Sequence, residues 1–161
     1  MPDTTPTAPM PSHRWWWEDF PVGSARELGS VSVTREAVLD FARQFDPQPF
    51  HLDDAAAQAS PFGRVAASGW HTCSLLMRMI CDGYLLDSAS LGSPGVENIK
   101  WVKPVYPGDT LHGRMTVLAA RSMMSKPHSG LVQSRSEVFN QHDELVMSME
   151  GWSMFGRRQS A

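Results

Sequence analysis

The spacing of apolar residues predicts a helix that begins after Thr34. Apolar side chains recur there at i, i+3, i+4 and i+7, as on one face of a helix: Val38, Phe41, Ala42 and Phe45. Thr34 is a favourable N-cap residue, and Pro47 disfavours helical backbone at Asp46. The helix is therefore expected to end at Asp46. Downstream, Asp53 is expected to cap a short alanine-rich helix that runs to Ala59.

The longest predicted helix covers residues 69–84. Its apolar residues lie on all sides of the helical wheel: Trp70, Leu75, Leu76, Met77, Met79 and Ile80. A helix that is apolar on nearly every side is normally buried on nearly every side. The rest of the chain is therefore expected to wrap around it.

Four segments after this helix have the composition and alternation of strands: 99–102, 110–119, 131–139 and 146–155. In the second of them, Leu111, Met115 and Val117 alternate with polar residues at a period of two. A short β-rich piece precedes the helices at Val31 and Val33. This order of elements predicts an α+β fold, in which a curled antiparallel sheet, a meander of about four strands, encloses the long helix.

Composition narrows the class of protein. A length of 161 residues suits one domain with an ordinary core. The 14 basic and 17 acidic side chains give a net charge of −3, whereas a protein that binds nucleic acid electrostatically carries a basic excess. No apolar run reaches the ~18 residues of a membrane span. Neither nucleic acid nor a membrane is therefore an expected partner.

The two cysteines are expected to be free thiols. Cys73 and Cys81 lie in one predicted helix, where a spacing of eight residues separates their Cα atoms by roughly 12 Å. That distance is too long for a disulfide, and neither cysteine has partners at the spacing of a zinc site. Buried free thiols are typical of a reducing compartment, so a cytoplasmic location is expected.

The ends of the chain differ from its centre. Residues 1–14 hold four of the twelve prolines and little apolar content, which predicts a disordered tail and not a signal peptide. The domain is expected to span 15–158, followed by a flexible C-terminus at 159–161. It opens on the tryptophans 15–17, which either stack on a ligand ring or, the interpretation we favour, cover a core edge or a subunit contact.

Candidate chemistry gathers around Asp46 and His51. They lie five residues apart in a segment stiffened by two prolines, and a rigid segment suits an acid/base pair, which must be placed within about 3 Å of its substrate. Taken alone, such a pair is also compatible with helix capping beside a surface histidine. Downstream, Ser68 and Gly69 open the long helix, whose first N–H groups lack internal acceptors and can stabilise an oxyanion.

Two motifs resemble the MaoC-like, (R)-specific enoyl-CoA hydratases. The first is the run Phe45-Asp46-Pro47-Gln48-Pro49-Phe50-His51, similar to D-x-N-P-x-H, followed by a glycine that opens the central helix. The second runs from Trp101 through Pro104-Val105-Tyr106-Pro107-Gly108-Asp109 to Leu111, similar to P-V-x-x-G-D-x-L. The resemblance covers roughly residues 15–158. It implies a hot-dog fold, a curled sheet around one helix, assembled as a homodimer or as a higher assembly of dimers.

The resemblance also implies roles for individual residues. Asp46 and His51 would be the catalytic pair, and the Gly69 N–H would bind the thioester oxygen. Ser68 and Ser74 would contact the substrate, although Ser74 is also compatible with a bond to its own helix backbone. Two positions depart from the family pattern: Gln48 stands where many members have asparagine, and Ser68 where many have histidine.

Three further observations bear on the site. His71, one turn into the helix, either replaces the missing family histidine or, the interpretation we favour, is a partly buried helix residue. Single basic residues could contact coenzyme A phosphates, without any being singled out: Arg64, Lys100, Lys103, Lys126 and Arg157. The remaining histidines lack the spacing of a metal site.

The function expected from the resemblance is a hydro-lyase that reversibly hydrates a trans-2-enoyl thioester, with a coenzyme A thioester as substrate and no metal or organic cofactor. Two alternatives remain open. A hot-dog thioesterase would need a carboxylate along the central helix, which has none before Asp82. A non-catalytic subunit that binds acyl thioesters is the other.

Overall fold

The computed structural model describes residues 12–158, and its centre is a single five-stranded antiparallel sheet. The strands are β1 (Ala25–Ser32), β2 (Gly95–Trp101), β3 (Thr110–Ser122), β4 (Ser129–Phe139) and β5 (Leu145–Gly156). They pair in the order β1-β3-β4-β5-β2. Register shifts interrupt every pairing, and such bulges increase the twist and bend of a sheet.

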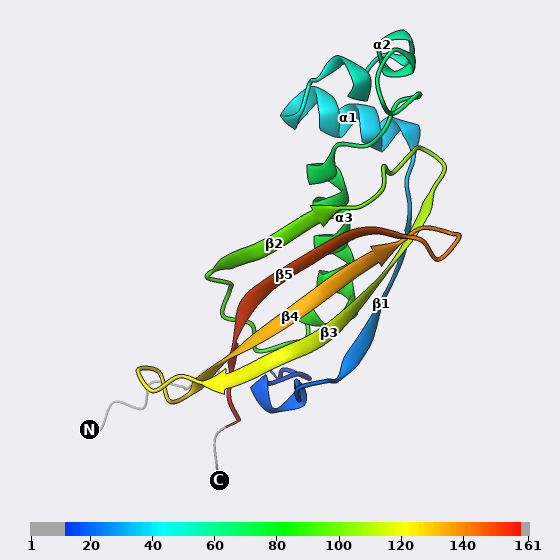
Figure 1. Cartoon of the computed structure of the whole chain (residues 1–161). Helices are drawn as coiled ribbons and strands as arrows, with labels where there is room; N and C mark the ends of the chain where they lie inside the picture. The colour runs from blue at the N-terminus through cyan, green and yellow to red at the C-terminus, as the bar shows by residue number, and fades with distance from the viewer. Residues whose placement is uncertain (1–11, 159–161) are drawn as a thin grey trace, which may run out of the picture.

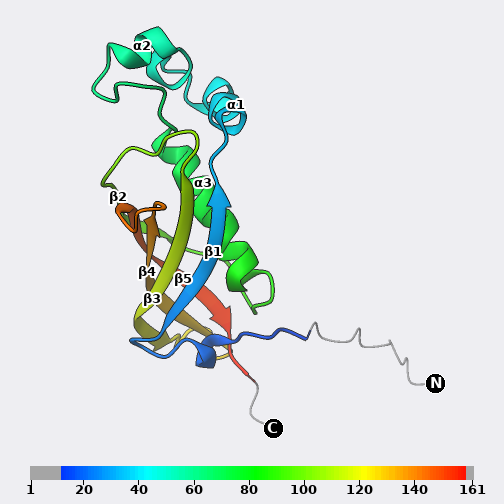
Figure 2. The ribbon, with the colours of Figure 1, turned by 90° about the vertical axis from the view of Figure 1, so that its right-hand side faces the viewer.

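The helices precede the last four strands. They are α1 (Arg35–Phe45), α2 (Asp54–Gln58) and α3 (Gly69–Ile80), which continues into a π-helical turn over Cys81–Leu85; short 3-10 turns lie at Trp17–Asp19 and Pro49–His51. The predicted caps are confirmed, because Thr34 accepts a hydrogen bond from Ala37 N–H and Asp53 from Ala56 N–H. In Figures 1 and 2 the long α3 lies along one face of the curled sheet, while α1 and α2 rise beyond one end of it. This arrangement is the hot-dog fold.

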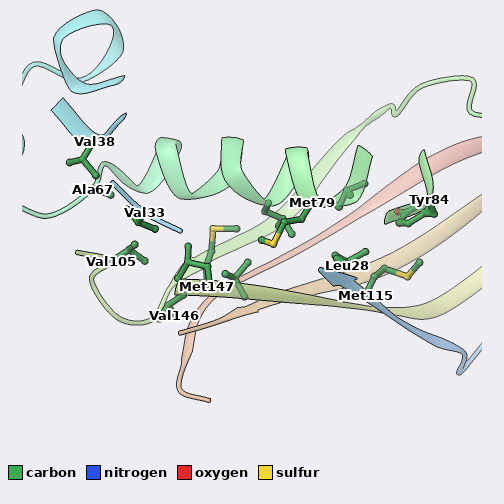
Figure 3. Close-up of a cluster of buried hydrophobic side chains, with 14 of the residues drawn as sticks. Leu28, Val33, Val38, Ala67, Met79, Tyr84, Val105, Met115, Val146 and Met147 are labelled. Carbon is green, nitrogen blue, oxygen red and sulfur yellow. The ribbon is translucent and has the colours of Figure 1, made fainter. Parts of the chain in front are cut away.

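The core fills the space between α3 and the sheet (Figure 3). Met79 and Leu76 of α3 are buried against Leu28 of β1, Met115 of β3 and Met147 of β5. The alternation predicted for β3 is confirmed as far as Val117, where a register shift against β4 ends it. Both cysteines are free thiols.

Two expectations about packing are wrong. The first downstream strand is not part of a simple meander: β2 lies on the far side of β5, so the meander consists of β3, β4 and β5. In addition, α3 is not buried on every side. Trp70 is 57% and Met77 44% exposed, so within one copy of the chain a face of α3 lies open.

The amino-terminal tryptophans pack on the core. Trp15 and Trp17 contact the buried cluster, and the indole N–H of Trp17 donates to Leu131 O at 3.1 Å. The preference for a core-edge role is thereby confirmed for these two. The expected tail over 1–14 lies for the most part outside the described residues, as does the expected flexible end at 159–161, but Arg14 N–H already donates to Asp87 O at 2.7 Å.

Candidate active site

One cavity collects the residues of both sequence motifs. It measures about 410 Å³ and lies between the end of α1, the 3-10 turn Pro49–His51, the first turn of α3 and the segment after β2. Asp46 and His51 line it from the first motif, and Trp101 and Val105 from the second. The second motif is joined to the approach to α3 by Ala67 N–H, which donates to Val105 O at 2.8 Å.

The carboxylate of Asp46 is held at both oxygens. Gln48 Nε2 donates to Oδ1 at 2.7 Å, and Ser68 Oγ donates to Oδ2 at 2.6 Å. Burial alone would raise the pKa of Asp46, but the hydrogen bonds from Ser68 and Gln48, together with the nearby His51, lower it below its usual value. Asp46 is therefore an ionised carboxylate near neutral pH.

The imidazole of His51 faces the same carboxylate. Its Nε2 lies 3.4 Å from Asp46 Oδ2, and its Nδ1 lies 2.7 Å from Ala66 O. A carbonyl oxygen can only accept, so Nδ1 carries a hydrogen and Nε2 is the nitrogen that faces the cavity. The ring is 5% exposed and lies against Phe50 and Phe62.

The first turn of α3 supplies the third element. Gly69 lines the cavity, and as the first helical residue its N–H has no acceptor within the helix. The indole of Trp101 packs directly on Gly69, so that an added Cβ would come within 2.5 Å of the ring. Trp101 Nε1 also donates to Gly69 O at 2.9 Å. The indole alone therefore requires a glycine at position 69, with or without a ligand at the N–H.

Ser68 and Ser74, which are expected to contact the substrate, both form hydrogen bonds at the start of α3. Ser68 is completely buried and caps α3, accepting from Trp70 N–H at 3.3 Å while it donates to Asp46. Ser74 is exposed, donates to Trp70 O at 2.9 Å and is not among the residues that line the cavity. The structure therefore brings Ser68 to the pair and leaves Ser74 bonded to its own helix.

His71 does not replace the family histidine. It is 6% exposed and stacks on Phe41 of α1 at 4.9 Å between ring centroids, and it does not line the cavity. Burial lowers its pKa, so the ring is neutral near pH 7. The favoured interpretation of a buried helix residue is confirmed.

The structure adds residues that the sequence alone did not assign. Gln48 fixes one oxygen of Asp46, and Trp101 anchors Gly69. Phe62 is held beside His51 because Tyr106 Oη donates to Phe62 O at 2.9 Å. Tyr106 and Trp101 both belong to the second motif, and that motif was the signal in the sequence that could have pointed to them.

Of the five basic residues considered for phosphate contacts, Lys103 alone lines this cavity, and it is paired with Glu144. Arg64 packs on the ring of Tyr106 and Arg157 on that of Trp17. Within residues 12–158, no group of three or more potential ligands is placed to hold a metal ion. Over the same residues, no helix is long and apolar enough to cross a membrane.

A second cavity of about 210 Å³ lies further along α3, between Met77 and Ile80 and the concave face of the sheet. It exists because small residues face the helix there. Ser134 pairs with Gly151, and Ser136 pairs with Met149, in adjacent rows of β4 and β5. No residue lines both cavities.

Comparison with known proteins gives consistent matches. The model of the MaoC like domain matches residues 20–138. The crystal structure of a MaoC-like dehydratase from Rhodospirillum rubrum superposes with a TM-score of 0.83 at 39% identity, covering 90% of this chain and 99% of that one. The uncharacterized protein YdeM of Bacillus subtilis is 27% identical over 134 residues, 83% of this chain and 93% of its own length.

A third relative matches over a shorter stretch. The mesaconyl-CoA hydratase of Cereibacter sphaeroides is 40% identical over 62 residues, which make up 38% of this chain and 18% of that enzyme.

The matched range 20–138 contains every residue that lines the first cavity. It includes Asp46, His51, the start of α3 at Gly69 and the second motif from Trp101 onward. The match exceeds half of the chain, and the fold and the placement of both motifs agree with it. The chain belongs to the MaoC-like dehydratase family.

Proposed function

We propose that this protein reversibly hydrates a trans-2-enoyl thioester, with coenzyme A as the expected thiol. The observation that carries the proposal is the placement of Asp46 Oδ2 and His51 Nε2 at 3.4 Å in one cavity, which Gly69 also lines with an N–H that has no acceptor within its helix. A carboxylate, an imidazole and an oxyanion donor are the groups that addition of water to a conjugated thioester needs.

In this proposal the elements of one water molecule are added. The Asp46–His51 pair takes a proton from water, whose oxygen forms a bond to C3 of the enoyl group. The electron pair of the C2–C3 double bond moves toward the thioester, and the oxygen that becomes negative accepts a hydrogen bond from Gly69 N–H. The pair then returns a proton to C2, which gives the 3-hydroxyacyl thioester and restores the pair.

The thioester itself acidifies C2, so the proposed reaction needs no metal or organic cofactor. A chelator such as EDTA should therefore leave the rate unchanged.

The direct test is the loss of enoyl-CoA absorbance across a panel of acyl groups, with product identified by chromatography. Asp46→Asn and His51→Gln should each lower kcat/KM by about 10²- to 10⁴-fold, because each removes a group that moves a proton. Asp40→Asn and His128→Gln are matched controls, since these residues do not line the cavity.

Two outcomes would contradict the proposal. Release of free thiol from acyl-CoA, without hydration, would identify a thioesterase. That outcome is not expected, because α3 carries no carboxylate along its length, and Asp82 in the π-helical turn that follows it is paired with Arg78. Binding of enoyl-CoA without turnover would identify a non-catalytic subunit.

We also propose that a second copy of the chain covers the open face of α3. Exposed apolar side chains adjoin that face on α3, on β2 and directly after β2, and they are Trp70, Met77, Val96, Trp101 and Val102. Among the described residues, β2 pairs with β5 alone, so one edge of this strand is free to pair with another chain. Apolar surface at an unpaired edge supports a homodimer.

A further inference from the structure

The hydroxyl of Ser68 has a single possible direction. Its Oγ accepts from Trp70 N–H at 3.3 Å and lies 2.6 Å from Asp46 Oδ2. A hydroxyl has one hydrogen, and an ionised carboxylate can only accept, so that hydrogen points at Asp46. Ser68 is completely buried, which leaves no water to exchange for this bond. The residue therefore links the start of α3 to the carboxylate.

The pair between Asp46 and His51 is one proton short of a hydrogen bond. His51 Nδ1–H is used by Ala66 O, so Nε2 of the neutral ring carries a lone pair toward Asp46 Oδ2. Two lone pairs face each other at 3.4 Å. A bond between them requires one more proton, and the partner with the higher proton affinity holds it.

We propose that Ser68 is a positioning residue of this pair: by donating to Oδ2 at 2.6 Å, it keeps Asp46 ionised and fixes the carboxylate oxygen that faces His51 Nε2. The inference rests on the proposed function for its catalytic meaning. It gives a role to the serine that precedes the helix glycine, at the position where many members of the family carry histidine.

The electrostatic surroundings of the Asp46 carboxylate agree with this role of Ser68. Burial would raise the pKa of Asp46, and the bond from Ser68 is the largest of the contributions that lower it, ahead of those from Gln48 and His51. The basic side chains on the adjoining elements have other partners. Lys103 pairs with Glu144 and Arg43 with Asp40, and His71 faces Phe41.

The test is a titration of the Asp46 side chain by ¹³C NMR, with the Cγ signal assigned by its loss in Asp46→Asn. Ser68→Ala should move the midpoint upward by about one pH unit or more, since a hydrogen bond to the charged form is lost. Ser68→Thr keeps the hydroxyl and should restore the original midpoint. Thr34→Ala is the matched control, because it removes the cap of α1 without touching the pair.

A second variant separates this role from helix capping. Ser68→Gly also removes the hydroxyl, yet glycine is tolerated at an N-cap far better than alanine. It should give the same shift of the Asp46 midpoint with a more stable protein. An Asp46 midpoint that stays in place in both Ser68→Ala and Ser68→Gly, or that moves equally in Thr34→Ala, would overturn the inference.

The kinetic readout distinguishes this inference from the proposed function. If the protein hydrates enoyl-CoA, the acid limb of its kcat/KM profile should move to higher pH in Ser68→Ala by the same amount as the NMR midpoint, with kcat at the plateau changing less. If it hydrates nothing, the proposed function fails while the titration still decides the role of Ser68. A profile that keeps its acid limb in an active enzyme contradicts the role of Ser68 alone.

Discussion

At the scale of single residues, the structure gives a reason for the glycine at position 69 that the motif does not reveal. The Trp101 ring occupies the space of a Cβ at this position, and its N–H is bonded to the Gly69 carbonyl. The glycine therefore fixes how the end of β2 meets the start of α3. Any side chain at position 69 has to displace the indole.

Because of this contact, we expect the effect of Gly69→Ala on the free energy of unfolding to change sign when the Trp101 ring is removed. Gly69→Ala alone should lower the free energy of unfolding by about 1–3 kcal/mol, the usual cost of overpacking. In a Trp101→Ala background the space is free, so the same change should be neutral or stabilising, because alanine is favoured over glycine in a helix. Urea unfolding of the four proteins measures the coupling. Equal effects of Gly69→Ala in both backgrounds would show that the ring is not the constraint.

The carboxylate of Asp46 predicts how stability depends on pH. Its pKa is lowered in the folded state, so its charged form stabilises the fold above the unfolded-state pKa of roughly 4, and this contribution is lost as pH falls through the folded-state value. The advantage of the wild type over Asp46→Asn should therefore be largest near neutral pH and shrink toward pH 3. Unfolding midpoints in urea at pH 7, 5 and 3 test this. A difference that grows on acidification would contradict it.

Residue spacing singled out Asp46, His51 and Gly69 as candidates, and the resemblance to the MaoC-like hydratases implied their roles. It could not assign the bonds of Ser68 and Gln48 to opposite oxygens of one carboxylate, which depend on where α3 begins relative to the end of α1. Nor could it show that Ser74 is exposed and bonded to the carbonyl of Trp70 in its own helix.

At the scale of elements, local patterns located the helices and strands but not their neighbours. The caps at Thr34 and Asp53 are local signals and were predicted. The place of β2 beyond β5 is a matter of pairing between distant segments, which no periodicity encodes. The apolar face of α3 was attributed to the sheet of the same chain, although part of it is left open.

The space between α3 and the sheet predicts a stabilising substitution. Ser136 is buried and faces the second cavity, where valine would fill empty volume and suit a strand. Ser136→Val should raise the free energy of unfolding by about 0.5–1 kcal/mol. Ser148 of β5 pairs with Glu137 and does not line this cavity. Ser148→Val is therefore the control, because it tests the strand preference of valine without filling the cavity. Unfolding in urea should show a gain for Ser136→Val above that of Ser148→Val, and a loss would contradict the packing argument.

At the scale of the whole molecule, the open face of α3 and the free edge of β2 predict self-association. Val96 is 55% exposed on β2, so lysine there leaves the folded chain intact but puts a charge into the proposed interface. Val96→Lys should shift the protein toward the monomer in sedimentation velocity, with its circular dichroism retained. Val22→Lys, at a residue 62% exposed outside that face, should not. Wild type that sediments as a monomer at all concentrations would contradict the dimer.

The segment from Asp46 to Gly69 holds the carboxylate, the imidazole, the serine and the helix N-terminus, and no strand interrupts it. It projects past the end of the sheet with α2 (Figure 2). Hydrogen bonds to Trp101, Val105 and Tyr106 hold it, together with the ion pair between Arg35 and Asp54. The groups of the proposed chemistry thus lie in one stretch of chain, which also adds Ala57, Val65 and Ala67 to the buried core. A graft of this segment into a related scaffold would therefore need counterparts of Arg35, Trp101, Val105 and Tyr106 there, as well as space for its core residues.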